Sequence, residues 1–267
     1  MTVLVLAMSA ADPTVETILE KLTENQTRAH DLRRQIVYRQ DILTRMHGGD
    51  NKLKREEKYE YLVVPTEKSF DRKLVNFAGK YERHGRFMIY DRPEYQYQDI
   101  DIDGSVISEI TEDWTGDKES RDGMSDDLFP LTREKQKHYD FSLGGAETYQ
   151  GRTVWKIAYK PKKDEDFEKW WAGEALVDRE QFQPVLITSH QSKGVPMAVK
   201  VLLGTDIRKM GFKVNYRDFG DGLWFPEKYG GELDVRVLFG YRRKISISMV
   251  NSDVKRAKAE STIKYDP

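Results

Sequence analysis

Hydrophobic and polar residues alternate along most of this chain, which is the period of a β-strand with one buried face. In the segment 32–46 the even positions are largely apolar and the odd positions are largely polar. The same period returns in 58–65, 73–79 and 86–93, and again in several segments between 138 and 250, with Gly, Pro, Asp or Asn between them. The pattern predicts about ten to twelve strands in consecutive, antiparallel order.

Helical spacing occurs at the start of the chain and at one later point. We expect a helix from about Pro13 to His30, with Asp12 as its N-cap and proline in the first turn. A second, short helix is expected from Thr132 to His138, after Pro130. The apolar stripe of the first helix needs a covering surface, and its residues are Val15, Ile18, Leu19 and Leu22.

A sheet of this size does not stay flat, since strands beyond about ten normally curl or split into two sheets. The pattern therefore predicts a mainly β (α+β) protein with a single curved antiparallel sheet. This sheet would form a half-open β-barrel, covered by the N-terminal helix and a short lid helix. We find no linker or internal repeat and expect one domain at 12–267. Residues 1–11 are apolar and end in small residues, so they are expected to be the remnant of an export signal.

The segment DIDIDGSVISEI, Asp99 to Ile110, matches the opening of a calcium-binding EF-hand loop. Such a loop needs a glutamate at its twelfth position, where this chain has Ile110. The alternation favours a β-hairpin instead, with Asp103-Gly104 as the turn. In that hairpin Ile100 and Ile102 would face inward and the three aspartates would face solvent. We therefore expect no metal here.

Composition narrows the classes of function. The 44 basic and 45 acidic side chains nearly cancel, and no basic run is interleaved with aromatics, which argues against nucleic acid as a partner. Cysteine is absent, which excludes thiol catalysis, cysteine zinc sites and disulfides. The chain has no nucleophile elbow, phosphate-binding loop or dinucleotide motif, and its five histidines are scattered. We expect neither an enzyme nor a cofactor.

Three segments of the second half carry a family resemblance. A strand at Gly151–Trp155 precedes the run Trp170–Gln191, and Leu223–Pro226 opens a strand after a Gly-Asp-Gly turn. Together with the N-terminal helix that leads into a long strand near Tyr38, these segments resemble the outer-membrane lipoprotein-sorting superfamily, the LolA/LolB-like proteins.

The resemblance implies an exported or periplasmic binding protein that shelters the acyl chains of lipids or lipoproteins in an apolar cavity. Its partners would be a lipid or lipidated protein and an envelope protein, and peripheral contact with a membrane fits this role. An envelope-stress sensor that binds a protein partner, and less favourably an envelope hydrolase, are the alternatives. The family also implies an arginine that locks the lid, for which the sequence offers Arg33, Arg34, Arg39 and Arg45.

The residues expected to line the cavity come from the apolar faces of the predicted strands, because a ligand pocket is concave and mostly apolar. Periodicity does not tell which face is concave. The expected residues are Ile36, Tyr38, Ile42, Tyr61, Val63, Phe87, Ile89, Val199, Val201, Val235 and Val237.

Overall fold

The structure, a computed structural model, describes residues 12–33, 35–66, 70–115, 132–163, 171–190, 206–237 and 241–257. Residues 1–11, where we expected the remnant of an export signal, lie outside the described residues. None of the described helices has the length and the apolar character needed to cross a membrane.

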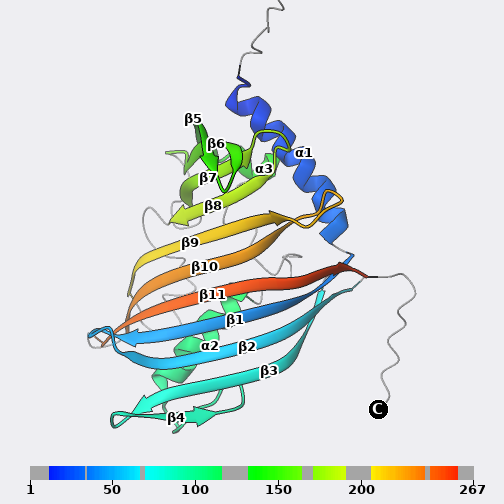
Figure 1. Cartoon of the computed structure of the whole chain (residues 1–267). Coiled ribbons are helices and arrows are strands. Elements are labelled where there is room, and N and C mark those ends of the chain that lie inside the picture. The colour runs from blue at the N-terminus through cyan, green and yellow to red at the C-terminus, as the bar shows by residue number, and fades with distance from the viewer. Residues whose placement is uncertain are drawn as a thin grey trace, which may run out of the picture.

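Eleven strands and three helices make up the described chain (Figure 1). The helices are α1 (Val15–Arg33), α2 (Ile102–Thr115) and α3 (Arg133–Gln136). The strands are β1 (Ile36–Gly48), β2 (Leu53–Pro65), β3 (Phe70–Arg83), β4 (Arg86–Tyr90), β5 (Tyr139–Tyr149), β6 (Arg152–Pro161), β7 (Ala172–Asp178), β8 (Pro184–His190), β9 (Asp206–Asp218), β10 (Trp224–Val237) and β11 (Tyr241–Arg256).

All the strands belong to one antiparallel sheet with the order β4-β3-β2-β1-β11-β10-β9-β8-β7-β6-β5. The first strand pairs with the last along most of its length, from Ile36 with Arg256 to Gly48 with Arg243. The two edge strands, β4 and β5, lie at opposite ends of this order and do not pair with each other, so the sheet stays open. The predicted fold class, a single curved antiparallel sheet with few helices, is confirmed.

Both helices that the sequence predicted are present, with small changes at their ends. Helix α1 begins at Val15 because Thr14 is its cap: the Thr14 hydroxyl accepts the N–H of Thr17 at 3.3 Å. Asp12, the expected cap, instead forms an ion pair with Arg179. Helix α3 lies inside the predicted short helix and is capped by Thr132.

The hairpin expected at Asp99–Ile110 is wrong, because this segment forms the start of helix α2. Asp101 caps the helix: its carboxylate accepts the N–H of Gly104 at 2.9 Å, and its carbonyl accepts the N–H of Ser105 at 2.9 Å. The orientations are also reversed, since Asp101 is buried whereas Ile100 is 74% exposed. A run of alternating aspartates fits a strand, but one of them, Asp101, supplies a helix cap here.

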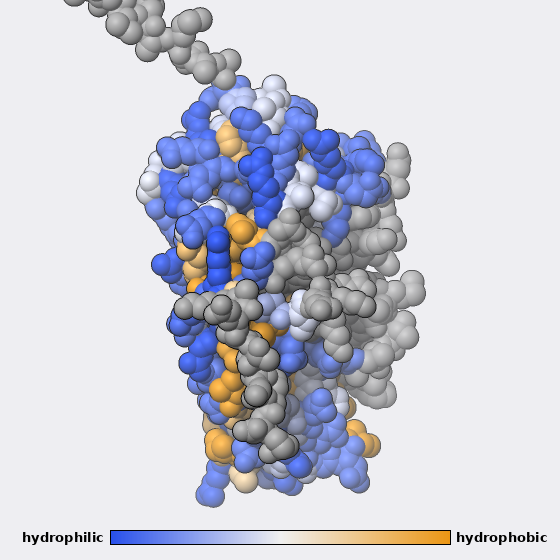
Figure 2. Space-filling view, turned by 90° about the vertical axis from the view of Figure 1, so that its right-hand side faces the viewer, coloured by the Kyte–Doolittle hydropathy of each residue, from blue (hydrophilic) through white to orange (hydrophobic). Residues whose placement is uncertain are grey.

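One face of the sheet, here called the inner face, carries the hydrophobic core and is covered by α1 and α2. In Figure 1, α2 lies across β11, β1 and β2. Helix α1 lies at the upper right, beside the ends of β8, β9 and β10. Ile18 and Leu22 of α1 and Ile107 of α2 are buried in the same core as Ile42 of β1 and Ile157 of β6. The main core therefore extends along the inner face from β1 to β6, and the opposite face is here called the outer face. Figure 2 shows that hydrophobic residues nevertheless reach the surface between hydrophilic ones in the middle and lower parts of the molecule.

Candidate functional site

Helix α2 fills the lower half of the inner face with an apolar stripe. Its residues Val106, Ile107 and Ile110 are at most 5% exposed, and they pack in one cluster with Ile42 and Met46 of β1. Their spacing of one and three positions puts them on one side of a helix. The apolar surface that the strands present is therefore occupied by side chains of α2 in this state.

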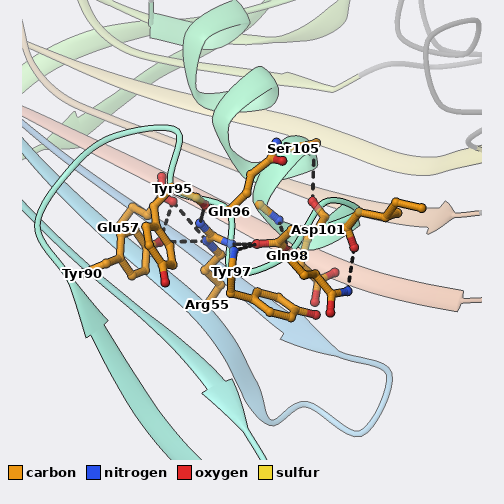
Figure 3. A network of polar contacts seen from close by, with 12 residues as sticks. Arg55, Glu57, Tyr90, Tyr95, Gln96, Tyr97, Gln98, Asp101 and Ser105 are labelled. Atoms are coloured by element: carbon orange, nitrogen blue, oxygen red, sulfur yellow. Dashed lines mark hydrogen bonds and ion pairs between the residues drawn. The ribbon is translucent and has the colours of Figure 1, made fainter.

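A buried charged cluster joins the start of α2 to the sheet (Figure 3). Arg55 of β2 is fully buried, and its Nη1 donates to the Oδ2 of Asp101 at 2.8 Å. Its Nε donates to the Oε1 of Glu57 at 3.1 Å and to the hydroxyl of Tyr90 at 2.7 Å. Its Nη2 donates to the carbonyl of Tyr95, in the loop before α2. One arginine thus holds a strand, an edge strand, a loop and a helix terminus together.

Two tyrosine hydroxyls complete the cluster by donating to Glu57. The hydroxyl of Tyr59 lies 2.5 Å from its Oε2, and the hydroxyl of Tyr90 lies 2.6 Å from its Oε1. Burial, reinforced by the charge of Glu57, raises the pKa of Tyr59 and of Tyr90, so both phenols stay protonated donors. Burial lowers the pKa of the Arg55 guanidinium, but its interactions with Tyr90, Glu57 and Asp101 outweigh this and leave the pKa raised. Each charge in the cluster is paired, as a buried charge must be.

Aromatic stacking positions the loop that brings Asp101 to Arg55. The ring of Tyr95 stacks on Tyr90 with centroids 4.8 Å apart, and the ring of Tyr97 stacks on Tyr81 at 5.0 Å. Gly104, in the first turn of α2, lets the helix approach, since a Cβ there would lie 2.6 Å from the Nη1 of Arg55. The contact between helix and sheet at this point is therefore mostly polar and aromatic.

Two further polar contacts hold α2 on the sheet. Asp103 binds Arg243 of β11 through both carboxylate oxygens, each at 2.9 Å from a guanidinium nitrogen. Thr111 and Thr44 of β1 are buried and hydrogen-bond through their hydroxyls at 2.9 Å. With Arg55, these contacts form what we call the α2 latch, defined by Arg55–Asp101, Arg243–Asp103 and Thr44–Thr111.

We expect Gly79→Ala to destabilise the fold by about 1–3 kcal/mol, because it overfills a packed site. A Cβ on Gly79 of β3 would lie 2.2 Å from the ring of Tyr90 and would push that ring away from Arg55 and Glu57. Gly211→Ala on β9 is the matched control, since its nearest contact would be an ordinary 3.5 Å. Urea denaturation of the two variants checks this, and equal midpoints would contradict it.

Some of the residues that we expected to line a cavity lie together in the structure, in two clusters. Ile42 and Val235 lie in the main core, while Ile36, Tyr38 and Val63 form a second cluster with Leu223 and Phe225 at the other end of β1. The ring of Tyr61 is partly buried and contacts both clusters. Val237 is the last residue of β10, and Val199 and Val201 lie outside the described residues.

Phe87 and Ile89 are corrected: they face away from the core and are 47% and 75% exposed. The neighbouring strand position, Tyr90, faces inward because Gly79 opposite it leaves room for its ring. Since side chains alternate along a strand, this turns Phe87 and Ile89 to the outer face.

None of the described arginines that the sequence offered as a lid lock holds α2. Arg39 and Arg45 form ion pairs with Glu60 and Glu56 on β2, and both are 45% exposed. Arg33 ties the end of α1 to β10, since its Nε donates to the carbonyl of Trp224 at 3.0 Å, and Arg34 lies outside the described residues. The arginines that hold α2 are Arg55 and Arg243, and sequence reasoning missed both.

The described residues hold no group of three or more His, Cys, Asp or Glu that could bind a metal ion. Hollows on the outer face are lined by apolar and polar side chains together. One of about 730 Å³ runs over glycines of β9 and β10, between Arg45 and Lys213. Its lining combines both signs of charge, Arg45, Lys213 and Glu232, with apolar groups such as Phe212, and does not select one kind of ligand.

No protein-family model matches this chain, and no curated protein sequence matches it. Among solved structures, one similar to it is a putative outer membrane lipoprotein-sorting protein domain from Vibrio parahaemolyticus, at 10% identity and a TM-score of 0.39, covering 92% of this chain and 95% of that one. A LolA superfamily protein from Nitrosomonas europaea matches at 12% identity and a TM-score of 0.36, covering 96% and 99%. A DUF1329 family protein from Desulfovibrio piger matches at 10% identity and a TM-score of 0.37, covering 91% and 95%. At these identities and TM-scores the matches carry no argument about family, ligand or role.

Proposed function

We propose that this protein binds the acyl chain of a lipid or lipoprotein on the inner face of its sheet, in the place that the apolar stripe of α2 occupies. The observation that supports this most is the pairing of an apolar contact with a polar latch. Val106, Ile107 and Ile110 cover the strands, whereas the ends of the contact are held by Arg55, Asp103 and Thr111. The apolar residues at 2–11 favour a site of action after export, in the periplasm.

The free energies of burying apolar groups support an exchange between helix α2 and the acyl chain. Each buried methylene contributes about 0.8 kcal/mol, so ten methylenes of an acyl chain contribute about 8 kcal/mol. Three buried aliphatic side chains of α2 contribute about 5–9 kcal/mol in the same place. The apolar terms nearly cancel, and the position of the equilibrium is then set by the polar latch. A carrier needs this balance, because a ligand held too firmly cannot be released.

The latch predicts the direction of a mutational effect on binding. Asp103→Asn weakens the two-pronged contact with Arg243 and therefore raises the fraction of molecules with α2 displaced. Because the apparent affinity scales with the competent fraction, we expect a fluorescent long-chain fatty acid to bind about five to ten times more tightly to this variant. Fluorescence titration of the purified protein measures it.

The matched control is Asp234→Asn, which weakens a similar two-pronged contact with Arg242. Arg242 precedes Arg243 on β11, so its side chain points to the opposite, outer face and does not contact α2. This variant should bind the fatty acid like the unchanged protein. If the unchanged protein and Asp103→Asn both fail to bind any acyl probe, the proposed function is wrong. If Asp103→Asn binds more weakly, α2 contributes to the site and does not compete for it.

A further inference from the structure

We infer that the protein forms a two-fold symmetric dimer, in which the edge strand β4 pairs antiparallel with β4 of a second copy around Met88. This inference goes beyond the acyl-binding proposal and does not depend on it. The partner follows from three properties of β4: its open edge, its self-complementary sequence and the charges at its two ends.

Strand β4 has one neighbour and an open edge. It lies first in the strand order, and in Figure 1 it forms the lower end of the sheet with β3 beside it. Among the described residues, no backbone hydrogen bond joins β4 to an element other than β3. Edge strands of soluble proteins normally carry charges or proline that prevent pairing. Strand β4 instead presents Phe87, Met88 and Ile89, which are 47%, 48% and 75% exposed.

The turn of the β3–β4 hairpin decides which backbone groups point to the open edge. The two residues at 84–85 have positive φ angles of 51° and 78°, as a two-residue hairpin turn requires, so Arg83 and Arg86 beside it are a hydrogen-bonded pair. Hydrogen-bonded and non-hydrogen-bonded pairs alternate along antiparallel strands. The N–H and C=O groups of Phe87 and Ile89 therefore point away from β3, to the open edge.

A second copy of the same strand matches these open groups. With the two-fold axis beside Met88, each Phe87 lies opposite Ile89 of the second copy, and the two residues exchange both of their backbone hydrogen bonds. The side chains agree with this register, because each such pair joins an aromatic residue to a β-branched one, which is a favourable cross-strand pair. The run from Phe87 to Ile89 is therefore complementary to itself.

The charges at the two ends of β4 favour the antiparallel direction. At the turn end, Arg83 and Arg86 form no ion pair with any described residue. The other end is followed by Asp91 and Glu94, two exposed carboxylates that also lack an ion pair within the described chain, with Arg92 as the one cation between them. Antiparallel pairing puts the basic end of each copy beside the acidic end of the other, whereas parallel pairing would put like ends together.

A single cysteine tests the register, because the chain has none of its own. In the inferred dimer Met88 lies opposite itself in a non-hydrogen-bonded pair, where the Cα atoms are about 4.5 Å apart and a disulfide can join them. Met88→Cys should therefore give a disulfide-linked dimer on mild oxidation, seen on a non-reducing gel. Ile89→Cys is the matched control. Ile89 is more exposed but lies opposite Phe87, so its thiol should cross-link about tenfold more slowly or less.

Sedimentation velocity of the unchanged protein tests the dimer itself. The strand has five residues, so the interface is small, and we expect a reversible dimer with a Kd of about 1–100 μM. Ile89→Pro removes an N–H that points to the open edge and leaves the bonds to β3 in place. It should weaken the dimer by about tenfold or more, whereas Ile89→Val keeps the N–H and should dimerise like the unchanged protein.

Three outcomes would overturn the inference. The first is a protein that stays monomeric well above this range of concentration, which would leave the open edge to an extended segment of another protein. The second is a dimer that Ile89→Pro does not weaken, because its interface would then lie elsewhere. The third is that Ile89→Cys cross-links as fast as Met88→Cys, because the disulfide would then form by random collision and not in this register.

Discussion

Replacing Arg55 with methionine is expected to lower the free energy of unfolding by about 3–5 kcal/mol, because it leaves the charges of Glu57 and Asp101 buried without their counter-ion. Asp101 is 2% exposed and Glu57 is fully buried, so water cannot take the place of the guanidinium. The hydroxyl of Tyr90 and the carbonyl of Tyr95 also lose their donor. Methionine keeps the apolar length of the side chain, so the loss reports on the charge.

The matched control for Arg55 is Arg217→Met, which removes an arginine whose ion pair with Glu227 is exposed. Arg217 is 61% exposed, and we expect a change of about 0–1 kcal/mol. Chemical denaturation followed by tryptophan fluorescence measures both variants. Equal losses for Arg55 and Arg217 would contradict the assignment of Arg55 as the centre of the contact between α2 and the sheet.

The fold could be predicted from the sequence because strands with one buried face alternate apolar and polar residues, and this period of two is visible in the sequence. Most of the segment 32–46 became β1, although Leu32 and Arg33 are the end of helix α1. The even positions from 36 to 46 face the core, as Ile36, Tyr38 and Ile42 illustrate. Helix α2 could not be predicted in this way. Its apolar residues Val106, Ile107 and Ile110 are β-branched and follow alternating aspartates, and both features favour a strand locally. The helix forms because tertiary contacts with β1 and β11 outweigh that preference.

The sequence does contain a sign of the charged cluster, but the rule that charged residues face solvent hides it. In LKREEKYEY the residues Arg55, Glu57 and Tyr59 share one face by the period of two, and this is the inner face of β2. Charged residues are seldom buried unless they are paired, so alternation alone reads them as solvent-facing. Their partner, Asp101, lies 46 residues away in a segment whose structure was itself misjudged. An ion pair between residues so far apart in the sequence depends on the fold, and the local pattern of residues does not reveal it.

A disulfide between α2 and β1 is expected to abolish acyl binding, and this is the largest functional effect that the structure predicts. The chain has no cysteine of its own, so Thr44→Cys with Thr111→Cys introduces the only thiols. The two hydroxyls already lie 2.9 Å apart in a buried contact. A disulfide joins Cβ atoms about 3.5–4.5 Å apart, which is compatible with side chains in such contact. The bond would fix α2 on the strands while leaving the apolar residues of both unchanged.

The measurement is fatty-acid binding by the oxidised double-cysteine protein, before and after reduction, with Thr44→Ser and Thr111→Ser together as the control. The control keeps both hydroxyls and cannot be locked. If the acyl chain takes the place of α2, the oxidised protein does not bind the fluorescent fatty acid, and reduction restores the affinity of the control. If the oxidised protein binds as tightly as the reduced protein does, the ligand does not displace α2 and the proposed site is contradicted.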